Sequence, residues 1–185
     1  MKRIFILLST LVFLITTPAM SATKGKGIEY GFSIGIGTGI PVSPSVFETN
    51  YDPSFGGILE FEASKWFLAV SASTDYNFFV ANGLEPNDVN ILTAYLNLKI
   101  KPVSSGSLRP YLLVGGGFFR YWVVDLQFSE NTTGWQFGGG VDIYISKTQR
   151  LFIDAKQVVG RTRETNAEGE NTSYIPVRIG LTFLF

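Results

Sequence analysis

The sequence predicts an all-β protein, an eight-stranded antiparallel up-and-down β-barrel with a polar lumen. Three observations indicate this fold. After residue 22, apolar and polar residues alternate with period two in segments of roughly 8 to 13 residues, the pattern of strands with two different faces. Residues that favour turns separate these segments, and no helical period competes with the alternation. Charged residues make up only 16% of the chain, whereas soluble domains average about 25%.

The segment before the strands has the pattern of an export signal. Lys2 and Arg3 precede an apolar run, and the small residues of 18–22 offer a cleavage site after Ser21 or Ala22. A transmembrane helix needs about 20 apolar residues, so the run favours a cleaved signal over an uncleaved anchor. We expect a signal peptide at 1–22 and one barrel domain at 23–185.

The first four predicted strands alternate clearly. Strand 28–40 sets isoleucine and aromatic residues against glycine and serine, and strand 55–63 sets Leu, Phe and Ala against two glutamates. Strand 66–78 sets Trp, Leu, Val and Tyr against Ser, Asp and Asn, and strand 90–101 sets leucine against Thr, Asn and Lys. A tight turn is expected at Ser64–Lys65.

The next four strands include one irregular segment. In strand 109–123 two triplets, Leu-Leu-Val and Gly-Gly-Gly, obscure the alternation. We place Tyr111, Leu113, Phe119 and Tyr121 outside and Arg120 inside, with room for a bulge near the glycines. Strand 134–145, a seventh strand containing 151–156, and strand 173–185 follow. The longer connections, which we expect at one end of the barrel, are 41–54, 79–89, 124–133 and 161–172.

The polar faces carry charges of both signs among many small residues. In a narrow lumen an unpaired charge is costly, so these side chains are expected to pair with one another. Asp75 and Lys101 share this face with the charge network that we predict for the lumen: Glu60, Glu62, Lys99, Arg120, Asp142, Asp154, Lys156 and Arg178. A structural salt-bridge network is favoured over a narrow ion path.

The apolar faces end in aromatic residues, as strands do where they leave a bilayer. The predicted girdle aromatics are Trp66, Tyr76, Tyr111, Tyr121 and Trp135. Together with a sparsely charged polar face, they favour a membrane barrel with a polar interior. A soluble, secreted, lipocalin-like barrel is the alternative.

The C-terminal residues resemble the assembly signal of bacterial outer-membrane barrels, in the pattern Arg178-x-Gly180-x-x-Phe183-x-Phe185. Segments 110–117 (PYLLVGGG) and 134–140 (GWQFGGG) are similar to strands of small OmpA/OmpX-like barrels, the "porin family" with an outer membrane protein beta-barrel domain. The resemblance implies location in the cell outer membrane of a Gram-negative bacterium, contact with outer-membrane lipid, and insertion by the barrel assembly machinery.

The composition argues against most site chemistry. The chain contains neither histidine nor cysteine, so imidazole and thiolate groups are unavailable as bases, nucleophiles or metal ligands. The enzymes among barrels of this kind rely on histidine. We therefore expect no catalytic, cofactor or metal site, and without a basic patch we expect no nucleic acid partner.

The Gly-rich run at 35–39 is the one segment that resembles a phosphate-binding loop in composition. It is not followed by the helix that a phosphate-binding loop requires, which favours a packing role.

The predicted role of the chain is a structural or interaction scaffold whose extracellular loops serve envelope integrity, adhesion or ligand display. The sequence does not identify the ligand, and a narrow channel for ions or small solutes is the alternative.

Overall fold

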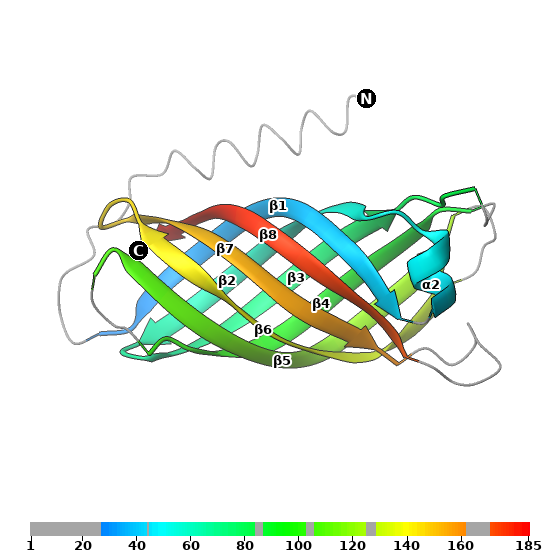
Figure 1. The fold of residues 1–185 in the computed structure, drawn as a ribbon. Coiled ribbons are helices and arrows are strands. Elements are labelled where there is room, and N and C mark those ends of the chain that lie inside the picture. The colour runs from blue at the N-terminus through cyan, green and yellow to red at the C-terminus, as the bar shows by residue number, and fades with distance from the viewer. Residues whose placement is uncertain (1–26, 44, 84–86, 103–105, 125–128, 162–170) are drawn as a thin grey trace, which may run out of the picture.

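The computed structural model describes residues 27–43, 45–83, 87–102, 106–124, 129–161 and 171–185 (Figure 1). Eight antiparallel strands follow one another around a closed barrel, and β1 pairs with β8 to complete it. The strands are β1 Glu29–Ser43, β2 Ser54–Lys65, β3 Leu68–Phe79, β4 Val89–Ile100, β5 Leu108–Val123, β6 Ser129–Tyr144, β7 Gln149–Gly160 and β8 Thr172–Leu184. The predicted fold is confirmed. The predicted signal peptide lies outside the described residues.

Two connections differ from the sequence prediction. The segment 124–133 is not a continuous loop, because β6 already begins at Ser129 and extends the hairpin with β5. The turn expected at Ser64–Lys65 falls at Trp66 and Phe67, since β2 continues through Lys65. Trp66 adopts a left-handed backbone conformation there, with φ of 58°, a region that non-glycine residues rarely occupy outside turns.

The structure also contains one short helix that the sequence pattern did not reveal. Between β1 and β2 a short helix, α2 (Ser45–Asn50), lies at the end of the barrel where the long connections gather (Figure 1). Six residues are too few for hydrophobic periodicity to reveal a helix. Phe47 of this helix is 4% exposed and packs against the inward-facing Phe79.

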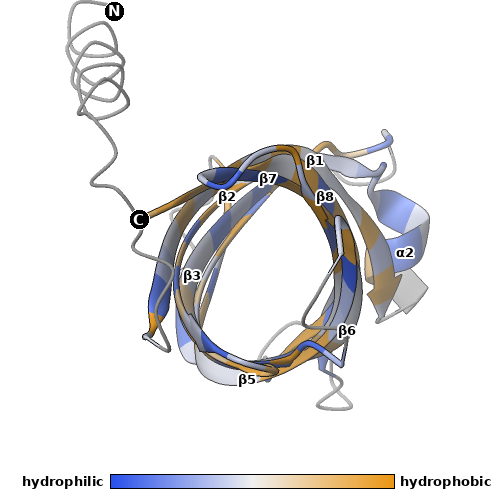
Figure 2. Cartoon of the chain, turned by 90° about the vertical axis from the view of Figure 1, so that its left-hand side faces the viewer, coloured by the Kyte–Doolittle hydropathy of each residue, from blue (hydrophilic) through white to orange (hydrophobic). Residues whose placement is uncertain are grey.

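The two faces of the sheet have opposite character. Exposed outward side chains include Phe32, Phe55, Leu96, Leu112 and Ile179, whereas the buried inner face is rich in charged and hydroxyl groups. Orange and blue segments accordingly alternate along the strands in a view along the barrel (Figure 2). An apolar surface this extensive is rare on soluble proteins and suits contact with lipid. No helix in the described ranges is long and apolar enough to cross a membrane.

Strand β5 corrects the predicted orientation. Its pairing with β4 runs without interruption from Val89↔Val123 to Ile100↔Leu112, so there is no bulge at the glycines. The side chains of Tyr111, Leu113, Phe119 and Tyr121 therefore point inward and are buried, and Arg120 points outward and is exposed. A register shift occurs instead in the pairing of β1 with β8, between Pro41 and Ser43.

Two glycines of β5 lie where the lumen has little space for a side chain. Gly115 and Gly117 occupy inward positions, where an added Cβ on Gly115 would overlap the amide oxygen of Asn97. On Gly117 a Cβ would overlap the carbonyl of Ala94. The lumen therefore has little free space beside these two glycines. On either side of them along β5, Tyr111 and Phe119 point inward and are buried.

Candidate functional site

The lumen is the candidate functional site, because it gathers nearly all the buried charge. Five carboxylates and five cations on the inner face are each at most 8% exposed: Glu60, Glu62, Asp75, Asp142, Asp154, Lys99, Lys101, Arg150, Lys156 and Arg178. The two signs balance. Every one of the five cations forms at least one ion pair with these acids.

Glu62 is the centre of a network near the short turns. Lys101 Nζ lies 2.6 Å and Arg150 Nη2 2.7 Å from Glu62 Oε1, and Lys99 Nζ lies 3.0 Å from Oε2. Lys99 lies on β4, Lys101 follows its last residue, and Arg150 lies on β7, so the partners come from both sides of β2. Three cations thus converge on one carboxylate, and the contact with Arg150 crosses the barrel.

Two further acids extend this network. Asp142 on β6 lies 3.1 Å from Lys101 Nζ and 3.4 Å from Arg150 Nη1. Glu60 pairs with Lys99 and accepts a hydrogen bond of 3.1 Å from the hydroxyl of Ser71. Strands β2, β4, β6 and β7 are therefore connected through side chains that fill the lumen at the short-turn end.

A second network lies closer to the loops and centres on Asp75. Arg178 Nη2 is 2.7 Å from Asp75 Oδ1 and Lys156 Nζ is 3.5 Å from Oδ2. Arg178 also donates to the amide oxygen of Asn77, and its Nη1 donates to the carbonyl of Thr38 at 3.0 Å. Because β3 and β7 lie on opposite sides of an eight-stranded barrel, the contact between Asp75 and Lys156 spans the lumen.

Asp154 lies between the two networks, and its carboxylate accepts a hydrogen bond from the hydroxyl of Tyr111. Tyr111 donates a hydrogen bond of 3.1 Å to Asp154 Oδ2, and the ammonium of Lys99 lies 5.0 Å from the centre of the Tyr111 ring. The prediction that Tyr111 is a girdle aromatic was therefore wrong. The inward orientation of β5 makes this residue part of the charged interior.

An aromatic cluster occupies the loop end of the lumen. Phe79 packs between Phe47 of α2, at 5.0 Å between ring centres, and Tyr174 of β8, at 5.5 Å. The cluster comprises Phe47, Phe79, Val89, Ile91, Tyr95, Phe119, Tyr121, Val158 and Tyr174. Tyr121, predicted as a girdle residue, is 5% exposed and belongs to it. Apolar packing thus adds a third layer above the two networks.

The structure brings together seven of the eight residues predicted for the lumen network: Glu60, Glu62, Lys99, Asp142, Asp154, Lys156 and Arg178. Arg120 does not join them, because β5 turns it outward beside the ring of Trp122. Arg150 was missed, since the sequence placed it at the end of a turn. It does share the parity of Asp154 and Lys156, and this was the signal that could have found it.

The remaining predicted site residues belong to the aromatic girdle and to the C-terminal motif. Trp66, Tyr76 and Trp135 are exposed on the outer side. Phe185 ends the chain at the short-turn end, where it exchanges two backbone hydrogen bonds with Tyr30 and stacks on its ring. Gly180 leaves no room for a Cβ beside the carbonyl of Ile34 and the ring of Phe152.

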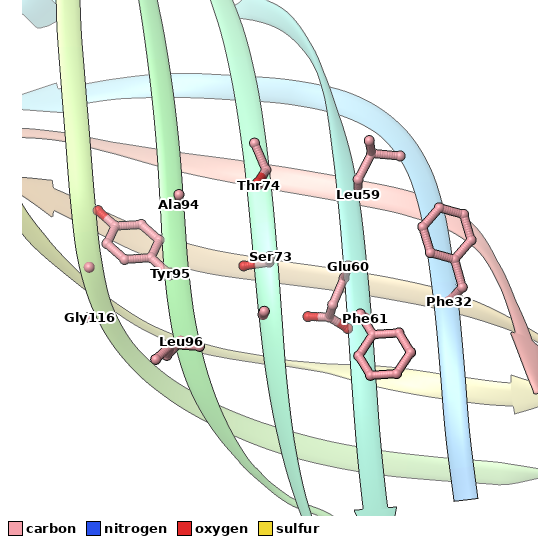
Figure 3. A pocket seen from close by; sticks show the side chains of 12 residues that line it. Phe32, Leu59, Glu60, Phe61, Ser73, Thr74, Ala94, Tyr95, Leu96 and Gly116 are labelled. Atoms are coloured by element: carbon pink, nitrogen blue, oxygen red, sulfur yellow. The ribbon is translucent and has the colours of Figure 1, made fainter. Parts of the chain in front are cut away.

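A hollow of about 540 Å³ lies along β1 to β5 (Figure 3). Most of its lining consists of exposed outward residues, with small side chains at Ala72, Ala94 and Gly116 and larger ones at Leu59 and Leu96. It is therefore a depression in the lipid-facing wall and not a passage along the lumen. Within the part of the chain that the structure describes, no cluster of acidic residues is arranged to hold a metal ion.

Comparison with known proteins agrees with this architecture. Residues 7–185 match the family described as outer membrane protein beta-barrel domain. Fold and interior define a closed β-barrel with a polar lumen, and the chain belongs to this family. The predicted resemblance is confirmed, and membership implies location in the outer membrane and contact with its lipid.

Solved structures share the fold. Neisserial surface protein A has a TM-score of 0.68 and 11% identity, with 85% of this chain and 97% of that chain covered. The attachment invasion locus protein Ail of Yersinia pestis has a TM-score of 0.57, 15% identity, and 85% and 99% coverage. OprG of Pseudomonas aeruginosa has a TM-score of 0.54, 12% identity, and 85% and 94% coverage. A sequence search of curated proteins gives no match.

Proposed function

We propose that this protein is a sealed outer-membrane barrel, a rigid scaffold that presents its long connections outside the cell for envelope integrity, adhesion or ligand display. One observation carries the proposal: charged side chains from strands that are not neighbours meet across the lumen, as Asp75 does with Lys156 and Glu62 with Arg150. Eight strands enclose an interior that side chains nearly fill. Pairs across the middle leave little space for a solute.

Three layers of side chains close the lumen, and their contacts also support a rigid barrel. The Glu62 network, the Asp75 network and the aromatic cluster follow one another along the barrel, and each joins strands that are not neighbours. Buried ion pairs add little net stability but strongly disfavour arrangements that separate them. Strand positions are thereby fixed relative to one another, as a support for loops requires.

Non-enzymatic action, export and assembly are further parts of the proposal. The lack of histidine and cysteine argues against catalysis. The pattern of 1–22 supports export by a cleaved signal peptide, and the motif of Arg178, Gly180, Phe183 and Phe185 supports insertion by the barrel assembly machinery. Exposure of Trp66, Tyr76 and Trp135 supports their role as girdle aromatics.

Planar-bilayer recording of the purified protein tests the sealed lumen. We expect no conductance steps from the wild type. Arg150→Ala and Arg178→Ala should also be silent, because each opens one layer and leaves two closed. Regular single-channel steps from the wild type, with a current or ion preference that either variant changes, would replace the scaffold with the narrow channel.

A further inference from the structure

Two arginines lie exposed on the outer side of the barrel at the loop end. Arg120 on β5 pairs with Asn131 of β6, and the backbone N–H of Arg161, just after β7, donates to the carbonyl of Thr133 at 3.2 Å. Only β6 therefore separates the two arginines, about 10 Å apart at the usual strand spacing. The exposed side chains of Asn131 and Thr133 lie between them.

Their level along the barrel is that of lipid headgroups. Thr133 is paired with Phe118, and Trp135 is paired with Val159. Phe118 is 41% and Trp135 49% exposed on the lipid side. Each arginine lies one outward position further toward the loops than these apolar residues. A charge at this depth costs little, whereas at the bilayer midplane it is strongly unfavourable.

Within the described ranges, the two guanidinium groups differ from the cations of the lumen, because no ion pair with a described acid is found for either of them. Among the described residues, neither Arg120 nor Arg161 forms an ion pair, and the Arg120 guanidinium carbon lies 5.5 Å from the centre of the Trp122 ring. Two guanidinium groups, an amide and a hydroxyl thus form a cluster of hydrogen-bond donors. A phosphate, with acceptor oxygens only, is the group that arginine forks bind best.

We propose that Arg120 and Arg161, with Asn131 and Thr133 between them, bind the phosphate of an outer-leaflet lipid headgroup. A lipid is favoured over free phosphate because the cluster faces the bilayer side of the sheet. The outward face of β5 also continues from Arg120 through Phe118 to Gly116, which borders the apolar hollow of Figure 3. This site concerns the outer wall and is independent of whether the lumen conducts.

Quenching of tryptophan fluorescence by brominated lipid tests the proposal. In a Trp66→Phe background the remaining tryptophans, Trp122 and Trp135, both lie beside the site. Protein purified from membranes is reconstituted in phosphatidylcholine vesicles that contain brominated phosphatidic acid or, in parallel, the same fraction of brominated phosphatidylcholine. We expect the phosphatidic acid to be enriched about fivefold at the site, the ratio for one basic residue at an anionic surface.

The double variant Arg120→Gln/Arg161→Gln should lose this enrichment, because only the guanidinium groups are removed from exposed positions. The matched control, Lys65→Gln/Lys147→Gln, removes two exposed cations from the opposite rim and should keep it. Equal loss in both double variants would reduce the effect to general electrostatics and overturn the site. Inorganic phosphate, compared with chloride at equal ionic strength, should leave the enrichment unchanged. If it abolishes the enrichment, the ligand is free phosphate and the lipid assignment is wrong.

Discussion

Replacing Arg178 with alanine should cost more stability than truncating Arg150 or Thr182, the two lumen residues compared with it below. Arg178 is 1% exposed, and its guanidinium holds Asp75 at 2.7 Å together with Asn77 and the carbonyl of Thr38. After truncation Lys156, at 3.5 Å, is the cationic partner that Asp75 keeps among the described residues. Removing one member of a buried pair typically costs about 3–5 kcal/mol. Water entering the vacated space should bring the cost to the lower end, about 3 kcal/mol.

Arg150→Ala is the informative comparison. Glu62 would lose the contact with Arg150 but keep Lys101 at 2.6 Å and Lys99 at 3.0 Å. Its carboxylate therefore stays paired, and the loss should be smaller than for Arg178→Ala. Thr182→Val, on the same strand as Arg178, removes one neutral hydrogen bond of 2.8 Å to Ser33 and should cost about 1 kcal/mol.

Urea unfolding in lipid vesicles, followed by tryptophan fluorescence, measures all three free energies. Adding Asp75→Asn to Arg178→Ala should recover part of the loss, since the carboxylate left without its main partner is then removed. If Arg178→Ala unfolds with the same free energy as Thr182→Val, the buried pair does not hold this part of the lumen together. An Arg150→Ala loss equal to that of Arg178→Ala would show that the number of partners around each acid does not govern its contribution.

Three further outcomes are expected. Deleting Phe185 removes the stacking and backbone pairing with Tyr30 that close β8 against β1, so the heat-modifiable folded form should decrease on gels; an unchanged yield would contradict this. Gly37→Ala would place a Cβ against the carbonyl of Val177 and should lower the free energy of unfolding in urea by about 1–3 kcal/mol. The outward Gly116→Ala should be neutral, because the atom nearest to its added Cβ is 3.6 Å away. The processed chain should fractionate with outer membranes and resist carbonate extraction, and recovery as a soluble periplasmic monomer would refute an integral barrel.

Strand β5 shows where sequence reasoning reached its limit. Alternation sets the faces of the other strands because successive side chains point to opposite sides of a sheet. In β5 aromatic residues, leucine and glycine lie on both faces, so hydrophobicity alone does not say which parity faces lipid. The tendency to place aromatics outside led to the wrong positions for Tyr111, Tyr121 and Arg120. Only the uninterrupted pairing with β4 decides the orientation.

In the lumen, the pairing of the charged residues could not be predicted from the sequence. The sequence identified most of the acids and bases that face inward, but it did not show which acid meets which base. Asp75 and Arg178 are far apart in the chain, and Glu62 and Arg150 lie on strands that are not neighbours. Contacts across the lumen depend on the stagger between strands around the closed barrel, a property of all eight pairings together.

The sequence by itself therefore determined the number of strands, the faces of seven of them and the polar character of the interior, because these follow from local alternation. The tertiary structure decided the orientation of β5, the three layers of side chains in the lumen, the helix that brings Phe47 against Phe79 and the outward position of Arg120. The physical reason is that the direction of a side chain is a property of its own strand. Its partner across a closed barrel is set by the register of every strand between them.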